Sequence, residues 1–321
     1  MEMERGRART AFSPSANIPH AGRRRFALPG KMMRKNTLTV VLAAMAALFL
    51  FPIALTFANS LMTESEISLN YAPLSEEGTG DGGGLPGNGD YVNLKLIPDR
   101  VTLSQYYGVL VKKPQFLFMF WNSVKLAVPI IFGQIAVSSL AAYAFAHLKF
   151  RLREPLFFAY IVTMLMPFQV TLVPNFIMAD LLGLINSYAS IILPGISGAF
   201  GVFLLRQFMA YIPYSYIEAA RADGASHPYI FARIVLPMCK PGIAALAILA
   251  FVDNWNMVEQ PLIFLSDAIK QPLSVYLSAV NAGELGIAFA ASALYMLPVI
   301  LVALYAENDL VEGIQLSGIK G

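Results

Sequence analysis

The sequence is poor in charged residues and in cysteine. Only 13% of its 321 residues are Asp, Glu, Lys or Arg, whereas a soluble domain carries about a quarter. The single cysteine, Cys239, excludes an internal disulfide and a metal site built from several cysteines. The phosphate-binding pattern G-x-x-x-x-G-K-[ST] is also missing, because Gly30-Lys31 is followed by Met32. We therefore expect that the chain does not bind and hydrolyse ATP by the P-loop route.

Long apolar runs dominate the sequence instead, with 57% hydrophobic residues and a mean hydropathy of +0.59. A helix needs about 20 residues to cross a hydrocarbon core of about 30 Å. Five stretches of that length contain no Asp, Glu, Lys or Arg: 36–63, 126–148, 155–179, 181–205 and 285–306. A sixth, 241–266, is interrupted by Asp253 and Glu259. The sequence therefore predicts an all-α membrane protein with six transmembrane helices. A soluble protein would need several buried helices that are apolar on every side.

The distribution of basic residues predicts the orientation of the chain. Nine of the 23 Lys and Arg residues precede the first span: Arg5, Arg7, Arg9, Arg23, Arg24, Arg25, Lys31, Arg34 and Lys35. Such a cluster beside a first span marks the cytoplasmic side. The loops 147–154 and 206–240 are basic as well, whereas 64–121 holds seven acids against four Lys and Arg. Six spans then place both termini in the cytoplasm.

Two segments outside the spans have a composition typical of unfolded chain. Residues 1–35 are predicted to form a disordered basic cytoplasmic tail, and residues 36–321 the transmembrane domain. A nucleic-acid-binding arm and a cleaved signal peptide are poorer interpretations of this tail, so no nucleic acid is expected as a partner. Residues 75–90 are predicted to form a Gly-rich external loop. Its Gly78, Gly80 and Gly83 match a dinucleotide-binding pattern, but they lack the strand and helix that this site requires.

The third and fourth predicted spans contain helix-perturbing residues. Pro167 and Pro174 lie in the third span, and Pro194 lies with Gly195, Gly198 and Gly201 in the fourth. Prolines and glycines within membrane helices accompany bent helices that line a cavity. They also allow ordinary close packing through small residues. The sequence leaves both interpretations open.

The cytoplasmic loop 207–240 has its own local signals. Pro213 suits the first turn of a helix, residues 214–223 are predicted helical, and Gly224 is able to take a left-handed C-terminal cap. Ser226 is predicted to cap a second helix that runs to Leu236-Pro237. The result is an elbow of two helices with small Ala219, Ala220 and Ala225 near its turn, where another protein could approach closely. An amphipathic helix lying on the bilayer is the alternative.

The elbow also resembles a known family. Glu218-Ala219-Ala220, three residues, Gly224, nine residues and then Ile234-x-Leu236-Pro237 is similar to the EAA loop of bacterial ABC importer permeases. Further segments resemble landmarks of the carbohydrate-uptake branch of that family, and within it the smaller permease subunits of maltose/maltodextrin importers. They are Asn122-Ser123, Leu140–Ala146, Leu204–Phe208, Trp255-Asn256 and the terminal Gly318–Gly321. The Gly-rich loop departs from the family pattern.

The resemblance implies a type I ABC importer permease fold, a mechanism and partners. The partners would be a second, homologous permease subunit, two ATPase subunits that bind ATP and Mg, and an extracytoplasmic solute-binding protein. The residues expected to couple to the ATPases are Glu218, Ala219, Ala220, Asp223, Gly224, Ala225, Leu236 and Pro237. The tail residues Gly318, Lys320 and Gly321 would reach the ATPase interface. The loop 257–284 would probe the binding protein's cleft. This chain itself is expected to hold no cofactor.

Polar residues within spans are costly in lipid and should face the interior. The candidates for a translocation path are Gln134, Gln169, Asn175, Asp253, Asn254 and Asn256. Asp253 has an alternative place near the external interface, where water would solvate it. The residues name no solute and no catalytic or metal site. An ion-gradient-driven transporter and a non-transporting scaffold stay as alternative functions, although the paired membrane-embedded charges and inverted repeats of the first are not evident.

Overall fold

The computed structural model describes residues 29–71, 92–279 and 285–318, with side chains for 36–71, 92–279 and 285–305. This part of the chain is helical and contains no strand. The predicted tail, up to residue 28, and the Gly-rich loop 75–90 lie outside the described residues. The chain divides into two units, one ending at Phe51 and the other beginning at Pro52. The helix packing and the candidate sites belong to the second unit.

The described residues include four helices long and apolar enough to cross a membrane, or up to six if each of two bent helix pairs is one span. The four are Asn36–Ser60 within α1 (Pro29–Ser60), α5 (Gln115–His147), Ala189–Ala210, and Leu285–Tyr305 within α16 (Leu285–Gly318). Ala189–Ala210 consists of α8 (Ala189–Ile196) and α9 (Ala199–Ala210). The prediction of an all-α membrane protein is confirmed, with helix boundaries that differ from the predicted ones.

The predicted third span, 155–179, is not one helix. It divides into α6 (Arg153–Met164) and α7 (Phe168–Leu181), which are bent by 102°. Pro167 stands at the break with an extended ψ of 138°. Proline has no N–H for the helical ladder and disfavours helical geometry in the residue before it. The predicted span is therefore broken at this point, which is one of the two outcomes that the sequence left open, and Pro167 explains the break.

The predicted fifth span, roughly 241–266, ends earlier as a helix. α13 (Lys240–Trp255) ends at Trp255, and a separate α14 (Glu259–Phe264) follows. On its other side, α13 meets the segment His227–Met238 at a bend of 75°. The remaining differences concern helix ends: α1 begins at Pro29 rather than residue 36, α5 begins at Gln115 rather than 126, and α16 continues to Gly318 rather than 306.

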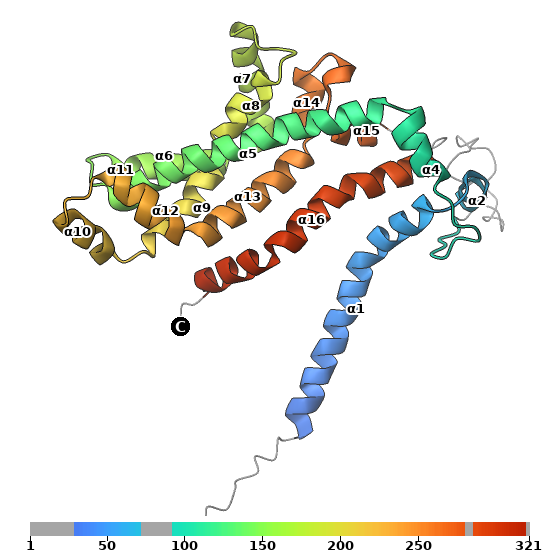
Figure 1. Ribbon diagram of the computed structural model, residues 1–321, viewed down its shortest axis with the longest axis horizontal. Coiled ribbons are helices and arrows are strands. Elements are labelled where there is room, and N and C mark those ends of the chain that lie inside the picture. The colour runs from blue at the N-terminus through green and yellow to red at the C-terminus, as the bar shows by residue number, and fades with distance from the viewer. Residues whose placement is uncertain (1–28, 72–91, 280–284, 319–321) are drawn as a thin grey trace, which may run out of the picture. The chain divides into compact units, whose positions relative to one another are not determined.

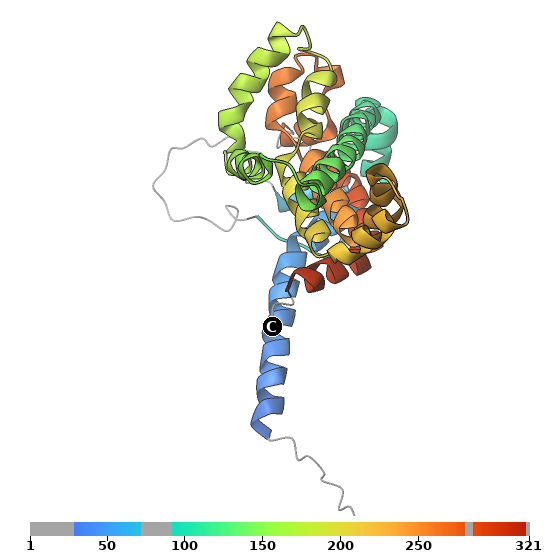
Figure 2. The ribbon, with the colours of Figure 1, turned by 90° about the vertical axis from the view of Figure 1, so that its left-hand side faces the viewer.

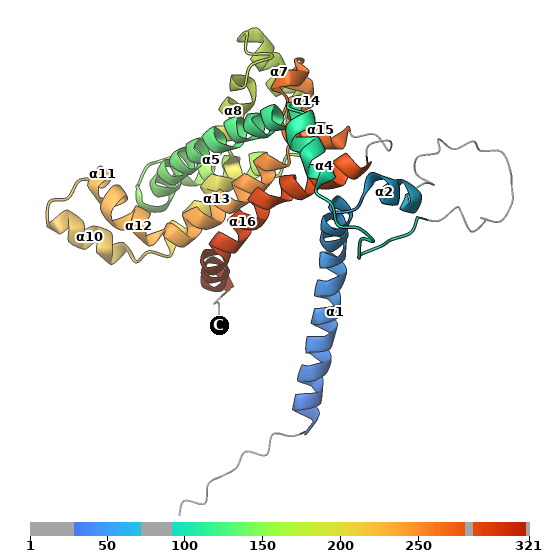
Figure 3. The ribbon, with the colours of Figure 1, turned by 45° about the vertical axis from the view of Figure 1, so that its right-hand side comes forward.

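α5 is the central helix of the second unit. It packs against α8, α9 and α13, and α13 packs in turn against α16, so that α5, α13 and α16 lie side by side in Figures 1 and 3. Close approach on α9 depends on glycine: a Cβ on Gly201 would lie 2.4 Å from Oγ of Ser138 on α5. Close packing through small residues is therefore one role of these glycines.

Short helices lie at the N-terminal ends of α5 and α16. They are α2 (Glu64–Asn70), α4 (Ser104–Tyr107), the π-helical turn Gly108–Lys112, the 3-10 turn Ala268–Lys270 and α15 (Leu273–Ser278). Glu66 accepts a hydrogen bond from the backbone N–H of Asp99 at 2.8 Å and forms an ion pair with Lys95 at 3.1 Å. The hydrogen bond between Lys95 and Asp99 raises the pKa of Lys95. These contacts attach residues 95–99 to α2.

Candidate functional site

The predicted elbow (residues 213–238) begins with one well-defined helix. α10 (Tyr214–Ala222) follows Pro213, which stands just before its first residue rather than within the first turn. Gly224 has a φ of +84°. The N–H of Ala225 donates to the carbonyl of Ala220 at 2.9 Å, and that of Gly224 to Arg221 at 3.0 Å. This is the Schellman pattern of helix termination, so the predicted helix and its glycine cap are confirmed.

The second part of the elbow is helical but irregular. It consists of α11 (His227–Ile230), a π-helical turn (Phe231–Val235) and α12 (Leu236–Met238). Ser226 occupies the N-cap position, but among the described contacts its hydroxyl makes no capping hydrogen bond. Its carbonyl accepts from the N–H of Ile230 at 3.0 Å, which is the first hydrogen bond of the helix. The predicted position of the cap is therefore confirmed, but the hydroxyl does not cap the helix: Pro228, the second helical residue, has no N–H to donate to it.

The apolar face of the elbow is buried by the protein itself. Ile217 of α10 and Ile230 of α11 are fully buried in a cluster with Leu205 and Met209 of α9 and Tyr143 of α5. A helix that lies on a bilayer needs its apolar face free to enter lipid. The geometry of α10 therefore favours a projecting helix that the rest of the protein holds in place. Figure 2 is viewed from the side on which α10 lies.

The expected coupling residues divide between the two faces of the elbow. The exposed ones are Glu218, Ala219, Asp223, Gly224 and Pro237. The half-buried ones are Ala220, Ala225 and Leu236, and the two alanines pack against the same cluster as Ile217. Only Ala219 of the three small residues is thus free for close approach by another protein, whereas the sequence predicted all three.

Three contacts between side chains join the elbow to α5 and the residues after it. The hydroxyl of Tyr143 lies 2.9 Å from Nδ1 of His227, and its ring lies 5.3 Å from that of Phe231. Lys149 places its ammonium 5.7 Å from the centre of the Tyr214 ring. Sequence reasoning missed these contacts, because no local pattern relates residues so far apart, such as the 84 positions between Tyr143 and His227. His147 is buried beside Tyr143.

A cavity of about 1140 Å³ lies among α5, α7, α8, α13 and α14. All six polar residues expected on the translocation path line it: Gln134, Gln169, Asn175, Asp253, Asn254 and Asn256. The structure thus brings together side chains from helices that are far apart in the sequence. Pro194, Gly195 and Gly198 line the same cavity, so the bent region of the fourth span both borders a cavity and packs closely.

The floor of the cavity is held by hydrogen bonds. The Tyr295 hydroxyl of α16 donates to the carbonyl of Trp255 at 2.9 Å and to Oδ1 of Asn256 at 2.8 Å. The indole N–H of Trp255 donates back to the carbonyl of Tyr295 at 3.2 Å. The amide of Asn254 donates to the carbonyl of Ala250 one turn earlier, at 2.7 Å. The end of α13 is therefore fixed against α16.

Residues 134–308 match the family described as the binding-protein-dependent transport system inner membrane component. The chain belongs to this family. It is therefore a multi-pass inner-membrane protein and a permease subunit of a binding-protein-dependent importer. The matched residues include the elbow and every predicted path residue. α1 and the segment between α1 and α5 lie outside them.

Individual relatives of the permease agree with this assignment. It is 28% identical to the arabinooligosaccharides transport system permease protein of Halalkalibacterium halodurans, over 72% of this chain and 84% of that protein. It is 32% identical to the sn-glycerol-3-phosphate transport system permease protein of Salmonella typhi, over 72% of this chain and 81% of that protein. A bacterial ABC transporter involved in the import of the acidic polysaccharide alginate has a similar fold, with a TM-score of 0.72 and 23% identity over 88% of this chain and 98% of that one.

The charge of the cavity in this permease is one-sided. Asp253 and Glu259 are exposed side chains that line it, and no Lys or Arg is among the described lining residues. The amide of Gln169 lies 3.4 Å from Oε2 of Glu259. Sequence reasoning noted Glu259 only as an interruption of a span and did not predict that it lines the cavity. Asp253 lines this cavity and its side chain is exposed.

Of the three tail residues expected at the ATPase interface, the structure describes one. Gly318 is the last residue of α16, and Lys320 and Gly321 lie outside the described residues. Within the described residues of the permease, no group of three His, Cys, Asp or Glu side chains is placed to hold a metal ion.

Proposed function

We propose that the permease converts ATP hydrolysis on separate ATPase subunits into solute translocation through its cavity. ATP and Mg would bind to those subunits and not to this chain. The observation that carries the proposal is the position of the elbow. Its α10 is exposed on one side, while its other side is attached to α5 and, through the bend at Cys239, continuous with α13. Both α5 and α13 line the cavity.

This connection supplies what energetic coupling requires. A ligand changes a conformational equilibrium only if it contacts the two states differently, and the effect reaches a second site only if a linked element has two arrangements. Displacement of α10 by a moving ATPase would act on Tyr143 and Ile217 together. It would then reach Gln134 along α5 and Asp253 along α13.

The exposed side of α10 supplies the contact surface of the proposal. Glu218 and Asp223 would make polar contacts in a groove of the ATPase, and Ala219 would allow close approach. Gly224 would keep the turn short, because its φ of +84° is unfavourable for other residues. Ala220, Ala225 and Leu236 would act from the inner side by keeping the elbow rigid. The C-terminal Gly318, Lys320 and Gly321 would add a second contact.

A second, homologous permease subunit would close the cavity. Leu249 and Val252 of α13 line the cavity yet remain exposed, at 46% and 37%. Exposed apolar side chains next to carboxylates in the middle of a membrane protein are better covered by protein than by lipid, because the charges need a polar interior. A solute-binding protein would deliver the solute from the external side.

The solute we propose is a neutral sugar or oligosaccharide. The relatives named above are transporters of arabinooligosaccharides and of sn-glycerol-3-phosphate. Asp253 and Glu259 would repel an anion inside a site of low dielectric constant, whereas carboxylate and amide groups hydrogen-bond well to sugar hydroxyls. The cavity therefore favours the neutral class of solute.

Reconstitution tests this function against an ion-gradient-driven transporter and a scaffold. The permease would be purified with its accompanying subunits and placed in liposomes with the binding protein and radiolabelled oligosaccharides. We expect uptake that needs ATP, stops with a non-hydrolysable analogue and persists when ionophores collapse ion gradients. Uptake that needs a gradient and not ATP would establish the secondary transporter. Purification without any P-loop ATPase, together with no uptake, would favour the scaffold.

A further inference from the structure

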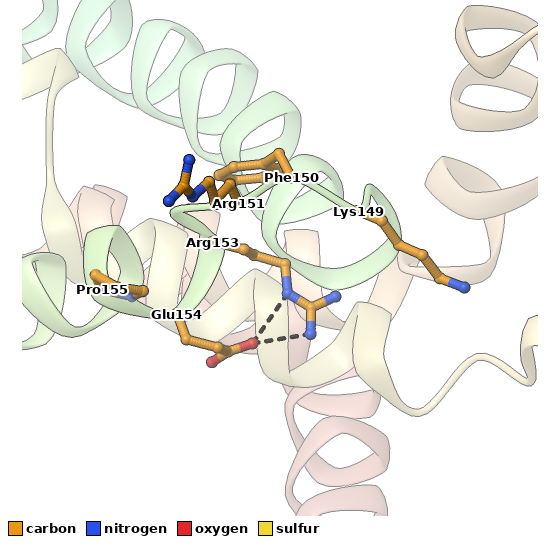
Figure 4. A pocket seen from close by; sticks show the side chains of 6 residues that line it. All are labelled: Lys149, Phe150, Arg151, Arg153, Glu154 and Pro155. Carbon is orange, nitrogen blue, oxygen red and sulfur yellow. Dashed lines mark hydrogen bonds and ion pairs between the residues drawn. The ribbon is translucent and has the colours of Figure 1, made fainter.

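A basic pocket lies between α5 and α6, apart from the elbow surface and the cavity. It has a volume of about 550 Å³ and is lined by Lys149, Phe150, Arg151, Arg153, Glu154 and Pro155 (Figure 4). The contact between Lys149 and Tyr214 places it at the elbow end of α5. Two apolar helices meet there, so the pocket lies where a span leaves the hydrocarbon.

Positive charge exceeds negative charge in this pocket. Its only carboxylate among the described lining residues is Glu154, which pairs with Nη2 of Arg153 at 2.8 Å. Arg206 of α9 adds a contact of 3.4 Å to the same carboxylate. Lys149 and Arg151 have no such anionic contact among the described ion pairs, and in Figure 4 both side chains point away from the pair of Arg153 and Glu154. Arg151 thus stays available for an anion, and Lys149 would become available by leaving the Tyr214 ring.

Apolar side chains border the same cations. Phe150 is 40% exposed and Leu152 is 56% exposed. α6 continues this apolar border with Leu156, which lies one turn after Leu152 and is exposed as well. A site for a free anion in water does not need such a border. A molecule with a phosphate at one end and hydrocarbon at the other would satisfy both parts.

We propose that this pocket binds the phosphate headgroup of an anionic glycerophospholipid. The phosphate would bind the guanidinium of Arg151, and Lys149 would turn toward it from the Tyr214 ring as the second cation. An acyl chain would follow Leu152 and Leu156, which lie one helical turn apart. Basic pockets at the cytoplasmic ends of transmembrane helices bind anionic headgroups in this way, and Arg is well suited to phosphate because its planar fork donates two parallel hydrogen bonds. The proposal does not depend on the identity of the transported solute.

Native mass spectrometry of the full-length permease in detergent, with any accompanying subunits, tests the proposal. Phosphatidylglycerol and phosphatidylcholine would be titrated separately, and phosphatidylglycerol also against excess inorganic phosphate. The double variant K149Q/R151Q is expected to weaken phosphatidylglycerol binding about 25-fold, since each Lys or Arg near an anionic lipid surface contributes a factor of about five. The matched control is K112Q/K113Q, which removes the same charge at the opposite end of α5.

The outcomes separate a lipid site from other sources of binding. Selective loss in K149Q/R151Q, with little change in the control and with phosphatidylcholine weak throughout, supports the site. Equal loss in both double variants would mean non-specific attraction and overturns it. Displacement of the lipid by inorganic phosphate would assign the pocket to a free anion and overturns the lipid. If K149Q/R151Q does not fold, E154Q replaces it: removing the competing carboxylate should strengthen phosphatidylglycerol binding about fivefold, and no change would overturn the proposal.

Discussion

The hydroxyl of Tyr143 on α5 lies 2.9 Å from Nδ1 of His227, the first residue of the elbow's second helix. Tyr143 is otherwise buried among apolar residues of the elbow and α9. This hydrogen bond is the direct polar link between the exposed α10 region and a helix that lines the cavity. It therefore offers a way to weaken the transmission of movement without changing either the elbow surface or the cavity.

Tyr143→Phe removes that hydrogen bond and keeps the ring packing. A hydrogen bond of this kind contributes about 0.5–1.5 kcal/mol, so we expect transport per ATP hydrolysed to fall about two- to tenfold. ATP hydrolysis by the assembled complex should persist. The measurement is the ratio of solute uptake to phosphate release in liposomes. Tyr211→Phe is the control, because Tyr211 is exposed. An unchanged ratio in Tyr143→Phe would remove this residue from the coupling path.

Gly224→Ala tests the turn of the elbow. No atom lies within 4 Å of the position that a Cβ would take, so the only effect is that of placing an L-residue at a φ of +84°, which costs about 1 kcal/mol. Gly224→Pro or Gly224→Asp should abolish transport and leave membrane insertion intact, because proline does not adopt positive φ and Asp adds a charge at the contact surface.

Gly183→Ala is a matched control for this glycine. Gly183 has a φ of +67°, also has open space around it, and lies between α7 and α8 away from the elbow. Both alanine variants should lower thermal stability by a similar amount, whereas only Gly224→Ala should reduce uptake per ATP. Wild-type uptake by Gly224→Pro would contradict the coupling role of the elbow.

Gly198→Ala is expected to disturb the cavity through Gln134. An added Cβ would lie 2.1 Å from Nε2 of Gln134, and overpacking of this kind costs about 1–3 kcal/mol. The measurement is the unfolding temperature of the purified permease, together with solute uptake. Gly108→Ala serves as the control, since its Cβ would meet only an ordinary contact at 4.0 Å. Adding Gln134→Ala should restore stability to Gly198→Ala, and a failure to do so would mean that the clash is elsewhere.

The carboxylates of the cavity should decide solute charge. The double variant D253N/E259Q keeps the shape of both side chains and removes both charges. We expect uptake of a neutral oligosaccharide to change less than about threefold and the discrimination against an anionic analogue of the same size to fall about 25-fold, since each of the two charges contributes about 1 kcal/mol even at a high effective dielectric constant. The measurement is competition between the two solutes. Unchanged discrimination would show that selectivity resides in other subunits.

Local sequence signals predicted the elbow well. Pro213 and Gly224 restrict the backbone by their own covalent structure, so they delimit α10 whatever surrounds it. Ser226 was a weaker signal, because a capping hydroxyl accepts from an N–H in the first turn of the helix, and Pro228 in that turn has none. The inward orientation of Ala220 and Ala225 depended on Ile217, whose burial is decided by helices distant in the sequence.

The sequence by itself determined that the chain is helical and enters a membrane. Long runs without charge are stable in lipid, and an α-helix satisfies all of their backbone hydrogen-bonding groups there. It also determined which polar residues had to be sheltered from lipid. Only the tertiary structure decided the bends near Pro167 and Cys239, the contact between Tyr143 and His227, and the meeting of Gln134, Asn175 and Asp253 around one cavity. Hydropathy records how apolar a segment is, but it does not say in which direction the helix runs or which side chains it meets. Packing between segments decides both.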